Sequence, residues 1–170
     1  VANQMLQPQN GDYDVACLQT SRGCPLNCEF CAASLRITSA FQQKPLDCVI
    51  DEIKAAVKVT DQPFLELADD NTFINKKWGR EFLRAITPLG VNWFTETDIS
   101  VADDDELLDL LAERGCRQIL IGLESPSGSD LGQVDPGNWK KSRSDRYLEA
   151  IEKIQSRGLS VNGCFILGLD

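Results

Sequence analysis

Residues 102–123 read ADDDELLDLLAERGCRQILIGL, a helix signal followed directly by a strand signal. Acidic residues in the first turn complement the helix dipole, and the leucines form one apolar stripe. Gly115 follows Arg114 and ends this helix, which we predict over residues 102–114. The apolar run at 118–123 predicts a strand, so the stretch is one helix-to-strand unit.

The same alternation of short apolar runs and amphipathic stretches extends over the rest of the chain. It predicts strands over residues 14–20, 63–68, 91–97, 118–123 and 159–167, and helices over residues 45–57, 102–114 and 145–157, with one more helix that carries Trp78, Phe82 and Ile86 on one stripe. Residues 125–144 read as a long loop with room for a short turn of helix. Helical connections between consecutive strands predict a parallel sheet, because right-handed βα connections are the rule.

Polar residues gather on one face of these strands. In the second strand Leu65 and Leu67 share the face that packs on helices, so the alternate residues look the other way. The polar face holds Glu66, Ala68 and Asp70 in that strand, Gly122 and Glu124 in the fourth, and Asn162, Ile166 and Gly168 in the fifth. Carboxylates and glycines on an inner face predict a curved α/β barrel with its site at the carboxyl ends of the strands.

Composition limits the possible partners and the location. The 170 residues suit one domain, and 26 acidic against 17 basic residues, a net charge of −9, disfavour nucleic acid and anionic membranes as main partners. The sequence has neither an apolar run of membrane-spanning length nor a signal-peptide layout, so we expect a cytoplasmic protein without a membrane span. The chain opens at Val1 without a methionine, and its last predicted strand runs almost to Asp170, so we expect a piece of a longer protein.

Histidine is absent from the sequence. The commonest general base and the commonest metal ligand are therefore missing. Within this segment we exclude serine or cysteine nucleophiles activated by histidine, and zinc sites that use histidine ligands.

Cys24, Cys28 and Cys31 form a Cys-x-x-x-Cys-x-x-Cys run directly after the first predicted strand. Three thiolates on one short loop reach a common point, which suits iron–sulfur ligation. A four-iron cluster normally takes four cysteines, so one iron stays open for a small ligand unless another cysteine joins. The other four cysteines, which we expect to be small core residues, are Cys17, Cys48, Cys116 and Cys164.

Other interpretations of the cysteine run remain open at this point. An iron–sulfur electron carrier would take a fourth cysteine ligand. A structural zinc site would also need a fourth ligand and usually pairs two Cys-x-x-Cys knuckles, which this sequence lacks. A disulfide scaffold is disfavoured by the odd number of cysteines, seven, in a chain without a secretion signal.

The cysteine run, with Phe30 just before its last cysteine, resembles that of the radical S-adenosylmethionine (radical SAM) superfamily. Further stretches resemble the branch whose members usually carry a cobalamin-binding domain upstream; these are residues 67–71, 102–108, 122–125 and 163–170. The resemblance extends from about residue 14 to the end of the chain. It implies that residues 1–170 are a radical SAM core domain, an α/β fold and a partial (βα)6 TIM-like barrel truncated after about the fifth strand.

The resemblance also implies cofactors and their contacts. Cys24, Cys28 and Cys31 would bind a [4Fe-4S] cluster whose fourth iron holds S-adenosylmethionine. The reductively formed 5′-deoxyadenosyl radical would then abstract hydrogen from the substrate. Expected contacts are Phe30 with adenine through its backbone; Ala68, Asp69 and Asp70 with the methionine amino group; Glu124 and Ser125 near the ribose or carboxylate; and Ile166 and Gly168 beside adenine. Many relatives carry Gly-Gly-Glu where this chain has Ala68-Asp69-Asp70.

The expected reaction is hydrogen abstraction from an unidentified small-molecule or lipid-like substrate, for methylation linked to cobalamin that a domain outside this segment would bind. A flavodoxin or ferredoxin would supply the electron. A methylthiotransferase-like tailoring enzyme is the alternative, since it shares the Gly-Leu-Glu-Ser strand end at 122–125, although it usually adds a second cysteine set and an RNA-binding tail. No residue is assigned a catalytic role, and we interpret Lys140, Lys141 and Arg143 as a solvated face.

Overall fold

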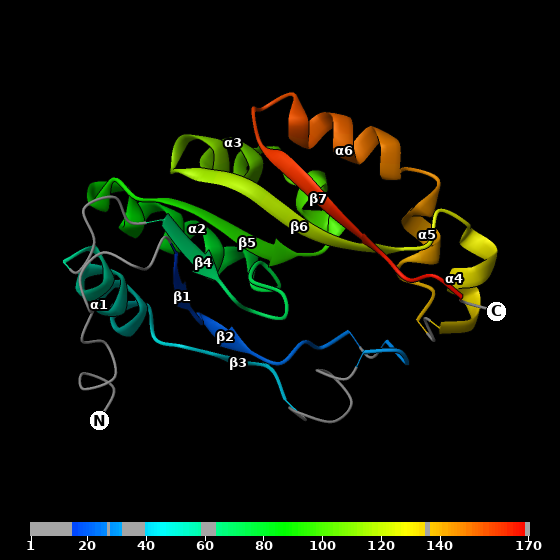
Figure 1. Cartoon of the computed structure of the whole chain (residues 1–170), viewed down its shortest axis with the longest axis horizontal. Helices are drawn as coiled ribbons and strands as arrows, with labels where there is room; N and C mark the ends of the chain where they lie inside the picture. Colours follow the sequence, from blue (N-terminus) through cyan, green and yellow to red (C-terminus); the bar gives the residue numbers. More distant parts are fainter. Residues whose placement is uncertain (1–14, 27, 32–39, 59–63, 135–136, 169–170) are drawn as a thin grey trace.

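A parallel sheet is the framework of the computed structural model, which describes residues 15–26, 28–31, 40–58, 64–134 and 137–168 (Figure 1). Within those residues the sheet has five strands in the order β1-β4-β5-β6-β7. They are β1 (Ala16–Leu18), β4 (Phe64–Leu67), β5 (Asn92–Thr97), β6 (Cys116–Glu124) and β7 (Ser160–Phe165). All four pairings are parallel, which confirms the predicted α/β fold and its βα order. The predicted strand ends at 14 and 63 lie outside the described residues.

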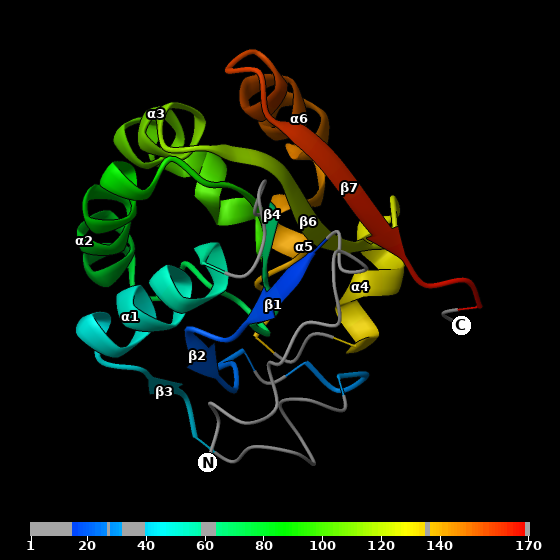
Figure 2. The same cartoon turned by 60° about the vertical axis from the view of Figure 1, so that its left-hand side comes forward.

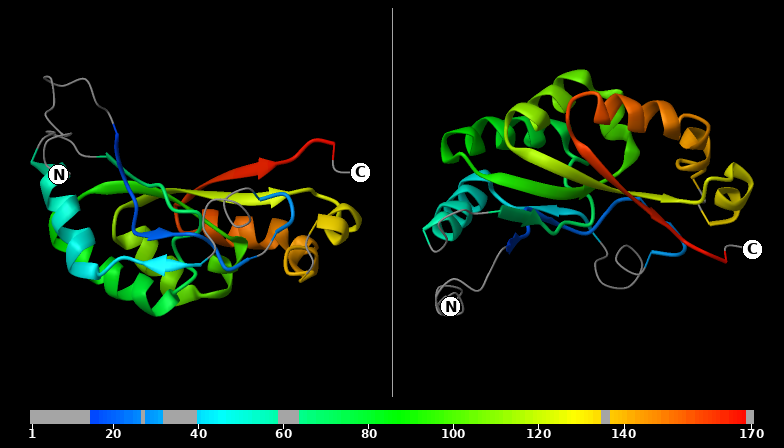
Figure 3. Two further views of the ribbon diagram at one scale, coloured as in Figure 1. Left: turned by 90° about the horizontal axis from the view of Figure 1, so that it is seen from below. Right: turned by 45° about the horizontal axis from the view of Figure 1, so that its top comes forward.

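Helices cover one face of the sheet and follow one another in an arc around it (Figure 2). The main helices are α1 (Leu46–Val57), α2 (Lys76–Ile86), α3 (Asp105–Glu113) and α6 (Tyr147–Gln155), each between two consecutive strands of the sheet. Shorter ones are the 3-10 turns η3 (Thr87–Leu89) and η4 (Ile99–Asp103) and the helices α4 (Gly128–Val134) and α5 (Lys141–Ser144). Seen from below the sheet, the helices lie on one side, and no helix of the described residues covers the opposite face, here called the open face (Figure 3).

The hydrophobic core lies between the sheet and this helical layer. Trp93 of β5 is fully buried there, donates its indole N–H to the Arg114 carbonyl at 2.8 Å, and meets the edge of Phe82. Further side chains of the core, all less than 2% exposed, are Ile53, Leu65, Leu67, Leu107, Leu108, Leu111, Ile119 and Ile121. Burying each side chain of this size contributes about 1.5–3 kcal/mol to folding.

The open face of the sheet carries carboxylates and other polar side chains, as the strand alternation predicts, together with Phe94 and Leu120. Residues that pair across parallel strands share a face, so the register builds rows of neighbours. One row holds Cys17, Glu66, Phe94 and Gln118, and the next holds Glu96, Leu120 and Asn162. None of these seven side chains is buried. Carboxylates therefore line the open face near the ends of β4 and β5.

Some boundaries differ from those predicted. β2 (Ser21–Arg22) and β3 (Gln42–Gln43) form a short antiparallel pair that has too few residues to give a sequence pattern. The helix expected over 102–114 begins at Asp105, because the Asp104 carboxylate accepts a hydrogen bond from Leu107 N at 3.0 Å and caps it there. The residues just before form η4 instead.

The cysteines outside the 24–31 run were predicted to be core residues, which is right only for Cys116. Cys17 and Cys164 are exposed because they lie on the open face, in register with Glu66 and Gly122. Cys48 is exposed on α1. Among the residues that the structure describes, no helix is long and apolar enough to cross a membrane.

Candidate functional site

The three cysteines lie on the segment that leaves β2, at the end of the sheet where the parallel strands finish (Figure 1). Cys28 is 7% exposed, and its carbonyl accepts a hydrogen bond from Cys31 N at 3.1 Å, which makes a tight turn. Cys24 and Cys31 are partly exposed. Burial raises the pKa of the Cys24 thiol, against hydrogen bonds from the Leu26 backbone and the Asn71 side chain that lower it. Cys24 therefore favours the neutral thiol until a cation compensates its charge.

Asp69 holds the start of this segment against the end of β4. Its carboxylate is 1% exposed and accepts four hydrogen bonds within the protein. Oδ1 accepts from the backbone N–H groups of Thr20 (2.7 Å) and Ser21 (2.8 Å), and Oδ2 accepts from the hydroxyls of Thr20 (2.6 Å) and Thr72 (2.8 Å). Asp69 was predicted to contact the cofactor. In the structure its carboxylate joins the end of β1 to the residues after β4, and the contact with the cofactor stays a prediction.

The two neighbours of Asp69 also contact β1 and the cysteine segment. Asp70 is exposed, and its Oδ2 accepts a hydrogen bond at 2.9 Å from the backbone N–H of Gly23, the residue before Cys24. Ala68 N donates to the Leu18 carbonyl at 2.8 Å and extends the β1–β4 ladder. Of the three residues predicted at this strand end, Asp70 is the one whose side chain is exposed beside the cysteine segment.

Glu124 and Lys140 form a buried ion pair at the carboxyl end of β6. Lys140 Nζ lies 2.9 Å from Glu124 Oε1 and donates to the Gly122 carbonyl at 2.6 Å. It also lies 5.9 Å from the centre of the Phe30 ring, a cation–π contact. Phe30 and Glu124, which were predicted separately, are therefore brought together by one lysine.

The prediction that Lys140 belongs to a solvated face is wrong. Lys140 is 7% exposed, because its ammonium group is enclosed by Glu124 and Phe30. Lys141 is exposed as predicted. The sequence offers no pattern that separates the two adjacent lysines, because Glu124, the partner of Lys140, lies 16 residues away in the chain.

The remaining predicted contacts lie around Glu124. The Glu124 carbonyl accepts from Ile166 N at 2.8 Å, which brings the ends of β6 and β7 together. Ser125 is buried, and its hydroxyl donates to Asp130 at 2.9 Å and accepts from Ser127 N at 3.0 Å, so it fixes the start of α4. Gly168 is exposed with φ +86°, a left-handed conformation that suits glycine.

Acidic groups on the open face alter one another's pKa. The Cys17 thiol donates to Glu66 Oε2 at 2.8 Å, and this hydrogen bond, with partial burial and the charge of Glu66, raises the pKa of Cys17 to about 11. Burial raises the pKa of Glu96, with further contributions from Glu66, Asp70 and Asp69. The open face is therefore electronegative near the ends of β4 and β5.

A family model described as the Radical SAM superfamily matches residues 18–170, almost the whole chain. The chain belongs to the Radical SAM superfamily. Radical SAM membership implies a [4Fe-4S] cluster and S-adenosylmethionine as cofactors and identifies the chain as part of an enzyme family. The recognised resemblance and the partial barrel are confirmed.

Curated relatives match over most of the Radical SAM chain but extend well beyond it. The chain is 30% identical over 156 residues to the cytidylyl-2-hydroxyethylphosphonate methyltransferase of Streptomyces wedmorensis, covering 89% of this chain and 28% of that protein. It is 26% identical over 152 residues to the bacteriochlorophyllide d C-12(1)-methyltransferase of Chlorobaculum tepidum, covering 88% of this chain and 33% of that protein. The chain thus spans a third or less of the length of these relatives.

Two solved structures share the fold at low identity. The radical S-adenosylmethionine methyltransferase TsrM of Kitasatospora setae superposes with a TM-score of 0.73 at 19% identity, covering 88% of this chain and 29% of TsrM. The cobalamin-dependent S-adenosylmethionine radical enzyme OxsB gives a TM-score of 0.70 at 16% identity, covering 89% of this chain and 23% of OxsB. These likenesses concern the radical SAM barrel.

The donor set of the cysteine segment fits the [4Fe-4S] cluster that Radical SAM membership implies. The three cysteines, whose thiolates are soft ligands, lie on one short segment, and Cys28 is buried. In the described part of the chain, no three Cys, Asp or Glu side chains converge on one metal-ion position. A four-iron cluster does not require such convergence, because each of its cysteines binds a different iron.

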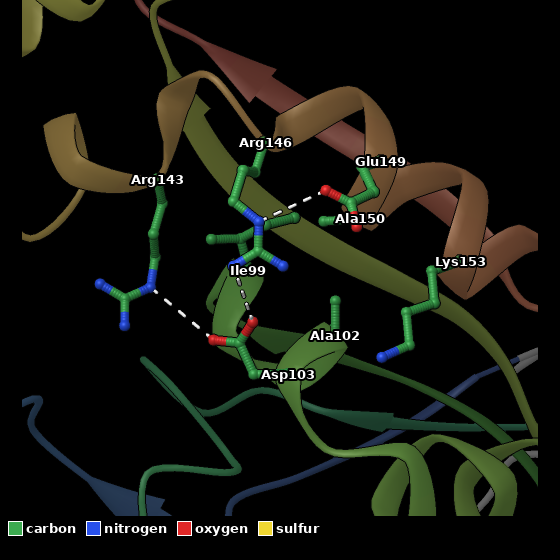
Figure 4. Close-up of a pocket in the computed structure, with 8 residues that line it drawn as sticks. All are labelled: Ile99, Ala102, Asp103, Arg143, Arg146, Glu149, Ala150 and Lys153. Atoms are coloured by element: carbon green, nitrogen blue, oxygen red, sulfur yellow. Dashed lines mark hydrogen bonds and ion pairs between the residues drawn. The ribbon is translucent and has the colours of Figure 1, made fainter.

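A pocket on the helical side of the molecule lies apart from this site (Figure 4). It is formed by η4 and the segment 143–153, and the cysteine segment contributes no residue to its lining. Its charged groups pair with one another, since Asp103 lies 3.9 Å from Arg143 and 3.8 Å from Arg146, which also contacts Glu149. These contacts join η4 to α6 and indicate a structural role.

Proposed function

We propose that Cys24, Cys28 and Cys31 each bind one iron of a [4Fe-4S] cluster, and that the fourth iron takes the amino and carboxylate groups of S-adenosylmethionine. The observation that carries this proposal is the position of the cysteine segment. Asp69 and Asp70 hold it against the carboxyl end of a parallel sheet, the end at which α/β barrels bind their ligands. The match of residues 18–170 to the Radical SAM superfamily supports the same assignment.

When bound, the cluster supplies one electron that cleaves the sulfonium of S-adenosylmethionine to methionine and a 5′-deoxyadenosyl radical, which abstracts hydrogen from the substrate. The residues of this chain would bind S-adenosylmethionine and orient it. We assign the Phe30 backbone, Ile166 and Gly168 to adenine, a role supported by the hydrogen bond from Ile166 N to the Glu124 carbonyl and by the shared contact of Phe30 and Glu124 with Lys140.

The polar groups of the adenosine and methionine parts of S-adenosylmethionine need partners at the same strand ends. Glu124 and Ser125 are proposed to lie near the ribose or the methionine carboxylate, and Lys140 to fix the Glu124 side chain. Ala68, Asp69 and Asp70 are proposed to lie near the methionine amino group. Because four internal hydrogen bonds occupy the Asp69 carboxylate, Asp70 is the side chain we expect to make that contact.

For the whole protein we propose methyl transfer to an unidentified small-molecule or lipid-like substrate, with cobalamin bound by a domain outside this chain. The support is that relatives named as methyltransferases match 88–89% of the chain. Further proposals are a flavodoxin or ferredoxin as reductant, residues 1–170 as a radical SAM core domain, no nucleic-acid partner, and a cytoplasmic location, where cysteines stay reduced.

The test is anaerobic reconstitution of the protein with iron and sulfide, followed by electron paramagnetic resonance (EPR) of the dithionite-reduced protein with and without S-adenosylmethionine. We expect a reduced [4Fe-4S] signal that changes when S-adenosylmethionine is added. The triple variant Cys24→Ala/Cys28→Ala/Cys31→Ala should lose the signal. A double variant at two exposed cysteines outside the run, Cys48→Ala/Cys164→Ala, is the matched control and should keep it.

Two outcomes would contradict the proposal. A cluster signal that survives the triple substitution would place the ligands elsewhere. A cluster that depends on the three cysteines but ignores S-adenosylmethionine would instead favour an iron–sulfur electron-transfer module.

A further inference from the structure

Lys140 lies between two parts of the proposed S-adenosylmethionine site that are far apart in the sequence. Its ammonium group donates to the Gly122 carbonyl at 2.6 Å and pairs with Glu124 Oε1 at 2.9 Å, both at the carboxyl end of β6. Its Nζ also lies 5.9 Å from the centre of the Phe30 ring, which belongs to the cysteine segment. Because the lysine is only 7% exposed, its charge is compensated inside the protein.

The ion pair of Lys140 and Glu124 lies on the open face of the sheet. Gly122 alternates along β6 with the buried Ile121 and Leu123, so a Cβ at position 122 would point to the open face. There it would collide with Glu124 Oε1 and lie 3.3 Å from Lys140 Nζ. The absence of a side chain at Gly122 therefore makes room for the pair on this face.

The backbone of Lys140 is held by its own neighbours in the chain. The Lys140 carbonyl accepts a hydrogen bond from Arg143 N at 3.0 Å, at the start of α5. The Arg143 guanidinium lies 4.2 Å from the ring centre of Trp139 and donates to the Trp139 carbonyl at 3.2 Å. Arg143 also pairs with Asp103 of η4 at 3.9 Å. The lysine side chain therefore projects from a fixed segment and can hold other groups in place.

We propose that Lys140 is a positioning residue for the adenosine part of S-adenosylmethionine, which acts by holding Phe30 and Glu124 in place relative to each other. The inference rests on the proposed function, in which the Phe30 backbone contacts adenine and Glu124 lies beside the same ligand. The Glu124 carbonyl accepts from Ile166 N at 2.8 Å, so the lysine also acts on the residue proposed beside adenine at the end of β7. One buried cation thus connects the cysteine segment to the ends of two strands.

Cluster binding and S-adenosylmethionine binding should respond differently to the loss of Lys140. Asp69 and Asp70 hold the cysteine segment without the lysine, through hydrogen bonds from the backbone N–H groups of residues 20, 21 and 23. In the reconstituted Lys140→Met protein, the reduced [4Fe-4S] EPR signal should therefore keep its intensity when no S-adenosylmethionine is present. The concentration of S-adenosylmethionine that gives half of the EPR change should rise about tenfold, a usual loss when a residue that orients a binding group is removed.

A competing ligand shows on which part of S-adenosylmethionine the lysine acts. 5′-Deoxyadenosine carries the adenosine part alone and should reverse the EPR change that S-adenosylmethionine causes. Its inhibition constant should rise in Lys140→Met by the same factor as the dissociation constant of S-adenosylmethionine. Weaker binding of S-adenosylmethionine with unchanged binding of 5′-deoxyadenosine would mean that Lys140 acts on the methionine part, and the inference would be wrong.

Phe30→Leu removes the ring and leaves the ion pair of Lys140 and Glu124 in place. It should weaken the binding of S-adenosylmethionine, because the lysine then has no ring to hold. The double variant with Lys140→Met should lose less affinity than the product of the two single losses, since both changes break the same contact. Independent effects of the two changes would overturn the inference. If Lys140→Met does not fold, Phe30→Leu decides alone, and an unchanged affinity in it contradicts the inference.

Leu111→Ala is the control for stability. Leu111 is fully buried on α3, which ends just before β6 begins, so it lies near the opposite end of that strand from Glu124. This variant should lower stability strongly and leave the affinity for S-adenosylmethionine unchanged. An equal loss of affinity would mean that any weakened core reduces binding, and the role of Lys140 would be disproved. A wild-type cluster that ignores S-adenosylmethionine would instead contradict the proposed function and remove the site that Lys140 is inferred to serve.

Discussion

Glu124 and Lys140 pair at 2.9 Å with both side chains almost fully buried, although Glu124 has the unusual backbone angle φ +67°. A non-glycine residue in this region costs of order 1–3 kcal/mol and persists only where its surroundings hold it. The β6–β7 register shifts between Gly122 and Glu124, so the strand irregularity turns the carboxylate toward the lysine. The ion pair therefore neutralises the buried charge of Glu124 and helps to hold its strained backbone, next to the proposed S-adenosylmethionine site.

Replacing Lys140 should be strongly destabilising. In Lys140→Met the Glu124 carboxylate stays buried without its cation, and breaking a buried pair from one side costs about 3–5 kcal/mol. Urea unfolding followed by circular dichroism measures the loss. Lys141→Met, a change at the exposed neighbour, should alter stability by less than about 0.5 kcal/mol. Equal losses in the two variants would show that the ion pair does not account for the effect.

Adding one methyl group at Gly122 should disrupt the same pair. A Cβ at this position would collide with Glu124 Oε1 and come within 3.3 Å of Lys140 Nζ. Gly122→Ala should therefore lower the free energy of unfolding in the wild-type protein but much less in a Lys140→Met background, because the pair is already broken there. Gly132→Ala is the control, since its Cβ would meet only the flexible end of Lys141. Strict additivity of Gly122→Ala and Lys140→Met would argue against this coupling.

The parts of the fold that could be predicted from sequence are those governed by local periodicity. Leu107, Leu108 and Leu111 are fully buried on α3, and alternation in β4 separates buried Leu65 and Leu67 from the open face. Such patterns depend on neighbours within a few residues, so the sequence carries them directly. The βα order and the parallel sheet follow from the same signals.

The cofactor-site residues were harder to place because their partners are distant in the chain. Lys140 pairs with a residue 16 positions away, and Asp69 accepts hydrogen bonds from Thr20, 49 positions away. For Asp69 the sequence carries a signal, because Asp69 continues the alternation of Leu65 and Leu67 and therefore falls on the buried side. For Lys140 no local pattern exists, because only the folded chain brings Glu124 and Phe30 to it.

Cys17 should react slowly with iodoacetamide despite its exposure. Its hydrogen bond to Glu66 raises its pKa to about 11, so little thiolate is present at pH 8. Glu66→Gln should lower the pKa of Cys17 and so raise its thiolate fraction. A thiolate of lower pKa is less nucleophilic, which partly offsets this gain, so we expect alkylation to be about tenfold faster. Peptide mass spectrometry over time gives the rate, with Cys48 in the same sample as internal reference. If Cys17 reacts at the same rate in both proteins, the carboxylate does not control the thiol.

Cys116 should make the protein lose stability in alkali. Burial raises the pKa of this thiol to about 12, against 9.0 as its ordinary value. Between about pH 9 and 12 the folded protein keeps the proton that the unfolded chain has lost, so the stabilising contribution present below pH 9 is lost as pH rises, by up to about 1.4 kcal/mol per pH unit. Cys116→Ala leaves a small cavity and lowers stability below pH 9, but it removes this slope.

The measurement is a series of urea unfolding curves from pH 7.5 to 10.5 for the wild-type protein, Cys116→Ala and Cys48→Ala. Lysines and tyrosines titrate alike in all three proteins, so the difference from wild type isolates the single thiol. Cys48 is exposed, and its variant should keep the wild-type slope. The difference in unfolding free energy between wild type and Cys116→Ala should shrink above pH 9, because only the wild type loses this contribution. A constant difference across the series would mean that Cys116 titrates alike in the folded and unfolded states and that its burial within β6 does not hold the proton.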